Sequence, residues 1–136
     1  MKIDRKKILL RFNGHCAYCG CKLEKMHIDH VIPQREFEYF IKNQRHIPEF
    51  LKHLTVSDVN HEDNLFPACS VCNLWKSAHS LEQFRFELGE QIKRLNQRSA
   101  NYRIAKKYGQ IKEAETIIVF YFETFAKTTF TPIDKT

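Results

Sequence analysis

Long hydrophobic runs are missing from this sequence of 136 residues. No stretch approaches the roughly 20 apolar residues that a membrane-spanning helix needs. The apolar stretch near the start, Ile8 to Leu10, is too short for the core of a signal peptide. Internal repeats and low-complexity linkers are also absent. We therefore expect one domain over residues 1–136, located in the cytoplasm and without a membrane partner.

Acidic residues are in the minority: 16 aspartates and glutamates stand against 22 lysines and arginines, a formal net charge of +6. Excess positive charge favours a polyanionic partner, and nucleic acid is the commonest one, ahead of an anionic membrane surface. A merely soluble, basic protein stays an alternative. The segment 76–107 holds eight basic residues and three glutamates, which predicts either a phosphate-tracking face or an ordinary solvated helix surface.

Hydrophobic patterning predicts short helices and short strands along the first half of the chain. Asp4 suits the N-cap of the first helix, and Pro33 suits the end of the first strand. The expected elements are a helix over 4–12, a strand over 26–32, helical turns over 35–54 broken at Pro48, a strand over 65–67 and a helix from Asn73.

An extension over residues 81–130 is predicted to contain helices and then a strand. Ser80 and Gln83 form a capping-box pattern, and a further helix is expected up to Gly109. Residues 116–122 are rich in β-branched and aromatic side chains, which favours a buried strand, although a helix is also permitted there. One face of the long helix after Ser80 is apolar, through Leu81, Phe84, Leu88, Ile92 and Leu95.

Four of the five cysteines form two C-x-x-C pairs, Cys16 with Cys19 and Cys69 with Cys72. In a reducing compartment such pairs are more often metal ligands than disulfides, and together they complete the tetrahedral shell of zinc. The gap of 49 residues between the pairs is longer than in compact zinc ribbons, so free cysteines stay an alternative. A closed site of four thiolates has no open position, which predicts a structural zinc. Cys21 is the spare cysteine.

Residues that suit phosphodiester hydrolysis lie between these pairs and directly after the second one. Histidine is the natural base near neutral pH, which suits His30. Hard divalent cations take oxygen ligands, which Asp29 and Asn73 offer. Because adjacent strand residues point to opposite sides, a metal ligand at Asp29 and a separate base at His30 are easier to build than a shared ligand pair.

The order of these residues resembles that of the HNH endonucleases, including phage and bacterial members. The resemblance covers about residues 8–80. It rests on the runs CAYCG from Cys16, HIDHVIP from His27, DNL from Asp63 and PACSVCN from Pro67, followed by Lys76. It implies an α+β fold with the ββα-metal core: two antiparallel strands and a helix around one catalytic metal, with zinc knuckles interleaved. The stretch 35–54 is then an inserted helical segment, and we expect Trp75 to pack the helix against the strands.

The resemblance also implies roles for individual residues. His30 is implied as the general base, and Asp29 and Asn73 as ligands of a catalytic Mg²⁺ or Mn²⁺. Asn64 is implied as the asparagine that braces the loop and orients His30. Lys76 stands where a basic residue often approaches the phosphate.

The implied function is an endonuclease that cuts or nicks double-stranded DNA, as a monomer or a homodimer. Its products would carry 5′-phosphate and 3′-hydroxyl ends. RNA as the substrate stays open, because the active-site residues would be the same. The alternative from another class is a zinc-stabilised nucleic-acid-binding module without catalysis, which the cysteines and the basic segment suit equally well.

Overall fold

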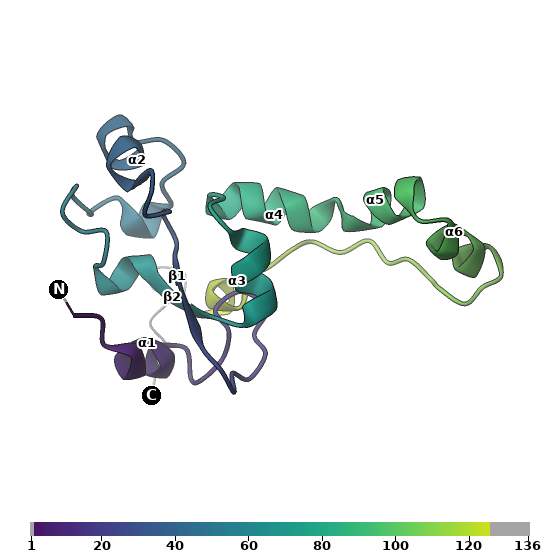
Figure 1. Cartoon of the computed structure of the whole chain (residues 1–136), viewed down its shortest axis with the longest axis horizontal. Helices are drawn as coiled ribbons and strands as arrows, with labels where there is room; N and C mark the ends of the chain where they lie inside the picture. The colour runs from purple at the N-terminus through teal and green to yellow at the C-terminus, as the bar shows by residue number, and fades with distance from the viewer. Residues whose placement is uncertain (1, 126–136) are drawn as a thin grey trace.

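Short helices surround one small sheet in the computed structural model, which describes residues 2–125 (Figure 1). The expected α+β class is confirmed. In chain order the elements, with η for a 3-10 helix, are α1 (Arg5–Arg11), β1 (His27–His30), α2 (Phe37–Asn43), η1 (Glu49–Leu51), η2 (Glu62–Asn64), β2 (Leu65–Ala68), α3 (Ser70–Lys76), α4 (Leu81–Gly89), α5 (Gln91–Arg98), α6 (Ala100–Lys107) and η3 (Tyr121–Thr124).

The sheet consists of β1 and β2 alone, paired antiparallel so that His30 faces Leu65. α1 packs against β2, and α3 packs against β1. The Asp4 side chain caps α1 by accepting a hydrogen bond from the backbone N–H of Lys7, as the sequence predicts. α3 begins three residues before the expected start at Asn73, because the Cys69 sulfur accepts the backbone N–H of Cys72 and caps the helix there.

Aromatic rings hold the centre of the molecule together. Phe66 of β2 is fully buried and contacts the rings of Phe12 and Tyr18. Tyr18 in turn contacts the rings of Phe84 in α4 and Phe120 near the end of the chain. The core therefore joins segments from both ends of the described chain, and burial of these rings is its main source of stability.

The inserted segment 35–54 belongs to this core. Its helical content is confirmed by α2 and η1, with a break at Pro48, the residue before η1. The insertion buries Phe37 and Ile41 from α2 and Leu51 and Leu54 from the region of η1. The segment, which lies between the two strands in the sequence, is thus packed structure rather than a loose loop.

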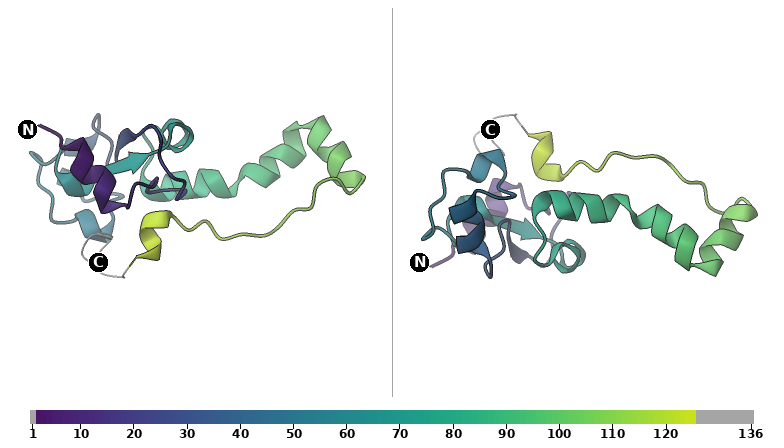
Figure 2. Two further views of the ribbon diagram at one scale, coloured as in Figure 1. Left: turned by 90° about the horizontal axis from the view of Figure 1, so that it is seen from below. Right: turned by 90° about the horizontal axis from the view of Figure 1, so that it is seen from above.

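The sequence predicts one long amphipathic helix from Leu81 onward. This prediction is wrong in one respect, because the segment forms two helices. α4 ends at Gly89 and α5 begins at Gln91. Leu81 and Phe84 are buried, whereas Ile92 is 40% exposed and Leu95 39% exposed. α5 and α6 extend away from the sheet (Figure 2), so the apolar face of α5 has little to pack against. No helix of the described chain is long and apolar enough to cross a membrane.

The strand expected over 116–122 is wrong: residues 111–120 have no regular secondary structure, and η3 follows them. This segment runs back alongside the helices toward the sheet (Figure 2). Ile117 is 88% exposed there, because no strand edge lies beside it. Hydrogen bonds hold the segment at several points: Glu113 accepts from Asn96 and Tyr102, and the Ile118 carbonyl oxygen accepts from Arg85. Directly after it, the N–H groups of Tyr121 and Phe122 donate to carbonyls in the first cysteine turn. Residues 126–130 of the expected extension lie outside the described residues.

Candidate metal centre and catalytic site

Four cysteines from two distant parts of the chain meet at one point. Cys16 and Cys19 lie in the turn after α1, and Cys69 and Cys72 lie at the start of α3. Their sulfur atoms all lie within 4.8 Å of one another, and none is in a disulfide. We call this group the cysteine cluster. Cys21 is exposed and stands outside it, as expected.

The electrostatics of the cysteine cluster favour a bound cation. A hydrogen bond from Cys72 lowers the pKa of the Cys16 thiol to about 4, so this sulfur ionises readily. The pKa of Cys72 is raised well above its usual value by its hydrogen bond to Cys16 and by burial. Cys16 is thus a ready anionic ligand, whereas Cys72 keeps its proton until a metal ion displaces it.

Backbone hydrogen bonds join the same two parts of the chain. The N–H of Ala17 donates to the carbonyl oxygen of Pro67 at 2.8 Å, which ties the first cysteine turn to β2. A metal held by all four sulfurs would reinforce this link and would fix the start of α3 against the sheet. The cysteine cluster thus positions the helix that carries Asn73 and Lys76.

Asp29 of β1 lies beneath α3 and is 5% exposed. The Tyr18 hydroxyl donates to its Oδ2 atom, and the Lys76 ammonium lies 3.2 Å from the same oxygen. Burial raises the pKa of Asp29, and the positive charge of Lys76 opposes that shift. Within residues 2–125 no hydrogen bond to Oδ1 is formed, so this oxygen is the one that could bind a cation.

Lys76 was expected beside a phosphate, but its side chain is completely buried. Its ammonium also donates to the carbonyl oxygen of His30 at 3.1 Å. Burial lowers the pKa of Lys76, and the attraction of Asp29 opposes that shift. Trp75 was expected to pack against the strands and is instead 44% exposed. α3 therefore turns Lys76, and not Trp75, toward β1.

His30 lies next to Asp29 in β1 and is half-buried. Its Nε2 atom lies 2.8 Å from Oδ1 of Asn60, in the loop before η2. Since a carbonyl oxygen can only accept, this contact places the ring proton on Nε2 and leaves the Nδ1 lone pair free to take a proton. The imidazole is thus held through Nε2, while Nδ1 has no hydrogen bond with a residue that the structure describes.

Asn64 braces the loop, but among the described residues its side chain forms hydrogen bonds with Ile32 and Val59 and none with His30. It is fully buried, and its Oδ1 accepts the backbone N–H of Ile32 at 2.8 Å. Its Nδ2 donates to the carbonyl oxygens of Ile32 and Val59 at 3.2 and 3.0 Å. The side chain that orients His30 is Asn60, which sequence reasoning missed. The available signal was a second asparagine four residues before Asn64 in the same polar loop.

Asn73 lies in α3, one residue after the last cysteine, and is half-buried. Its backbone N–H donates to the carbonyl oxygen of Cys69. Its carboxamide makes no hydrogen bond with any residue that the structure describes, so the amide oxygen is available as a ligand. Asn73 and Asp29 thus lie on two elements that pack together, α3 and β1, and each has a side-chain oxygen without a hydrogen bond to a described residue.

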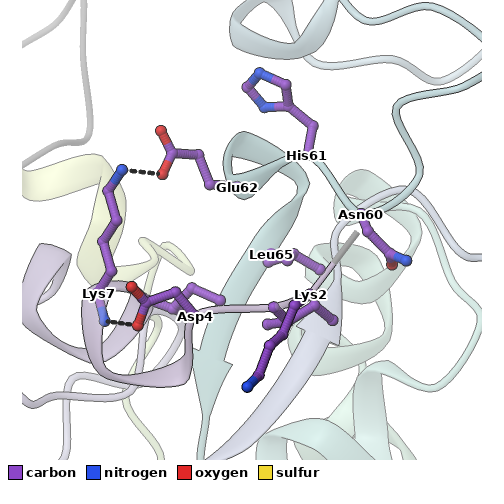
Figure 3. A pocket seen from close by; sticks show the side chains of 9 residues that line it. Lys2, Asp4, Lys7, Asn60, His61, Glu62 and Leu65 are labelled. Atoms are coloured by element: carbon purple, nitrogen blue, oxygen red, sulfur yellow. Dashed lines mark hydrogen bonds and ion pairs between the residues drawn. The ribbon is translucent and has the colours of Figure 1, made fainter.

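A cavity of about 370 Å³ borders Asn60 between the N-terminal segment and η2 (Figure 3). Lys2, Asp4 and Lys7 line one side, with Glu62 opposite them. The Lys7 ammonium and the Glu62 carboxylate neutralise each other at 2.7 Å. His30 does not line this cavity, so the cavity is separate from the candidate base.

Comparisons with known proteins found no relative of this chain. No family model matches the chain, and neither the curated proteins nor the solved structures contain a match. The function therefore has to be inferred from the residues themselves.

Proposed function

We propose that this protein is a metal-dependent endonuclease of the HNH type, which cuts or nicks double-stranded DNA with His30 as the general base. The observation that carries the proposal is the contact of His30 Nε2 with Asn60, which leaves Nδ1 free on a half-buried strand residue. Asp29 lies on β1 and Asn73 on α3, two elements that pack together, and this contact supports the proposal of a shared metal ion.

In the proposed reaction, His30 removes a proton from the attacking water, and the resulting oxygen nucleophile attacks the phosphorus atom. The bond from phosphorus to the 3′ oxygen breaks, and the departing 3′ oxygen takes a proton from solvent water to give the 3′-hydroxyl end. An imidazole suits this step near neutral pH. Asp29, through Oδ1, and Asn73 would hold a Mg²⁺ or Mn²⁺ ion, which supplies positive charge to the phosphate and the leaving oxygen. Lys76 has no direct part in this scheme, since its ammonium is buried against Asp29.

The cysteine cluster is proposed to hold a structural zinc. Zinc–sulfur bonds of about 2.3 Å in a tetrahedron place the sulfur atoms about 3.8 Å apart. The separation of 3.9 Å between the sulfurs of Cys19 and Cys69 supports this assignment. Four thiolates close the coordination shell, so this ion would take no part in the chemistry.

The test of the base is His30→Ala in a plasmid relaxation assay with Mg²⁺ or Mn²⁺, with EDTA as the metal-free control. We expect at least a hundredfold loss of cleavage, with zinc content and circular dichroism unchanged. The matched control is His46→Asn, which replaces an exposed histidine in the inserted segment and keeps a residue type that tolerates its positive φ of 56°. Full activity of the His30 variant would exclude this assignment.

Asn60 is proposed as the positioning residue of His30. Asn60→Ala should lower kcat more than it changes KM, because the hydrogen-bond acceptor for Nε2 of His30 is lost. Asn60→Asp keeps an acceptor and adds a negative charge, so it should restore activity and move the acidic limb of the pH–rate profile upward. A merely structural role would leave that limb in place.

One observation favours the alternative, a nucleic-acid-binding module without catalysis. The Lys76 ammonium already neutralises part of the Asp29 charge, which weakens the attraction of Asp29 for a second cation. If the protein binds double-stranded DNA or RNA but leaves both intact with every metal tested, this alternative replaces the nuclease proposal. Running both nucleic acids in the same assay also identifies the substrate.

A further inference from the structure

A second group of metal-ligating side chains lies apart from the cysteine cluster and from His30. His53 follows η1, while His61 and Asp63 lie at η2. One nitrogen of each imidazole and one oxygen of the carboxylate all lie within 4.8 Å of one another. We call these three residues the His–Asp cluster. No motif of the sequence pointed to it, because its members come from the inserted segment and the loop after it.

The carboxylate of Asp63 is held so that one oxygen faces both imidazoles. Its Oδ2 lies 2.9 Å from Nε2 of His53 and 3.8 Å from Nδ1 of His61. Its other oxygen, Oδ1, lies 3.2 Å from the guanidinium of Arg11, which is buried and also donates to the carbonyl oxygen of Glu62. An oriented carboxylate of this kind, with a hydrogen-bonded second oxygen, is typical of metal ligands.

The two imidazoles are positioned and accessible. His61 caps η2: its Nδ1 accepts the backbone N–H of Asp63 at 3.0 Å, which fixes the ring in the absence of an ion. Nδ1 gives up this hydrogen bond when it binds a metal. The ring points away from Lys2 and Leu65 (Figure 3) and stands edge-on to the His53 ring, with centroids 5.6 Å apart. The side chains of His53, His61 and Asp63 are 53%, 34% and 26% exposed, so an ion can reach them from solvent.

We propose that the His–Asp cluster binds one divalent transition-metal ion, with Zn²⁺ as the best match. Imidazole ligands favour zinc, cobalt and nickel over magnesium. Two imidazoles and one carboxylate leave an open coordination position, so this ion exchanges more readily than the one in the cysteine cluster. The competing state is the contact of His53 Nε2–H with Oδ2 of Asp63 at 2.9 Å, which a bound ion would replace.

The bound ion connects three parts of the fold. It joins the loop after η1 to η2, and through Asp63 and Arg11 it reaches α1. His61 directly follows Asn60, the residue that contacts His30. The ion therefore orders the loop on which Asn60 stands, whether or not the protein is a nuclease.

The experiment is a calorimetric titration of ZnCl₂ into the full chain, purified with the cysteine cluster loaded. We expect a second, weaker zinc equivalent in the wild-type protein. His53→Gln should weaken it at least tenfold, whereas His46→Asn should leave it unchanged. His53 is suited to this test because its side chain is 53% exposed, so its replacement leaves the core intact.

Two further measurements separate this site from the others. The second equivalent should persist in Asn73→Ala, which removes a ligand of the proposed catalytic ion. Co²⁺ in the second site should lack the sulfur charge-transfer bands that it shows in the cysteine cluster. The proposal is overturned if wild type binds a single zinc, if His53→Gln binds as well as His46→Asn, or if Asn73→Ala abolishes the second equivalent.

Discussion

The body of the molecule and its projecting arm are stabilised by different means. The body comprises α1 to α4, the sheet and the anchored end around η3, and it holds nearly all the buried residues. The arm comprises α5, α6 and the returning segment up to residue 116. α5 buries no residue, and α6 buries only Tyr102. Polar contacts hold the arm together: Glu113 accepts from Asn96 and Tyr102 and pairs with Lys106.

This difference predicts two kinds of response to substitution. In the body, every buried ring, ion pair and metal ligand depends on the others, so a single loss lowers the free energy of unfolding of the whole. In the arm, exposed ion pairs and single hydrogen bonds contribute little each, and opening of α5 and α6 does not expose the core. The predictions below set one region against the other.

The largest loss of stability is expected from Cys69→Ser in the body. It removes one sulfur of the cysteine cluster and the sulfur that caps α3. Binding of a structural zinc contributes about 10–16 kcal/mol, which exceeds the stability of a typical domain. We therefore expect loss of the metal and of cooperative unfolding, measured by mass spectrometric metal analysis and circular dichroism.

Cys21→Ser is the matched control, because Cys21 is exposed and stands outside the cysteine cluster. It should keep both the metal and the unfolding transition. A folded, zinc-loaded Cys69→Ser protein would mean that the body does not need the cluster.

A smaller but still large loss of stability is expected from Lys76→Met. It leaves the buried Asp29 carboxylate without its cation, and breaking one partner of a buried ion pair costs about 3–5 kcal/mol. Asp29→Asn combined with Lys76→Met should recover part of that loss, since no lone charge then remains. Urea unfolding monitored by fluorescence measures both variants.

The arm provides the control for Lys76. Lys93 lies 3.7 Å from Glu90 with its side chain 65% exposed, so Lys93→Met should hardly move the urea midpoint. If the two lysine variants were equally destabilised, the ion pair at Asp29 would not be what makes the body sensitive.

The position of Lys76 also marks where prediction from sequence ends. The two strands, the first helix with its Asp4 cap and the cysteine pairs were predictable, because each depends on spacing or on local chemistry. Lys76 was expected at a place where a basic residue approaches the phosphate, which needs an accessible ammonium. The opposite holds, because the Lys76 ammonium contacts the Asp29 carboxylate and the carbonyl oxygen of His30, and neither residue is near Lys76 in the sequence.

Two other differences have the same origin in non-local partners. Residues 116–122 have strand propensity, but a strand needs a free edge beside it, and propensity does not reveal whether one exists. Asn60 and Asn64 share one polar loop, and only the path of that loop decides which side chain reaches His30. The cysteine cluster was thus predictable from spacing, whereas the hydrogen-bond partners of His30 and Asn64 were not.

A moderate effect, on nucleic-acid affinity and not on stability, is expected in the arm. Of the eight basic residues in 76–107, Lys76 is buried, and four others pair with glutamates. Arg98, Arg103 and Lys107 are exposed and form no ion pair with a described residue. Replacing all three by glutamine should weaken DNA binding and reduce the salt slope by roughly 0.9 per lost phosphate contact.

Fluorescence anisotropy across a salt series measures this slope. The matched control changes the net charge equally, by replacing three exposed basic residues of the body by glutamine. These residues are Lys22, Lys25 and Arg35. Equal slopes in the two triple variants would show that the arm has no special contact with DNA and that only the net charge of the protein matters.

The smallest effect is a gain, expected from Gly89→Ala at the joint between α4 and α5. A methyl group added at Gly89 meets no atom within 4 Å, and alanine is favoured over glycine in a helix by up to about 1 kcal/mol. Hydrogen exchange should slow at the amides of α5, while the urea midpoint of the body stays unchanged. Gly109→Ala is the opposing control, because Gly109 ends α6 with a positive φ of 76°, which disfavours a side chain. Slower exchange throughout the body in the Gly89 variant would mean that body and arm unfold together, and the division between them would have to be given up.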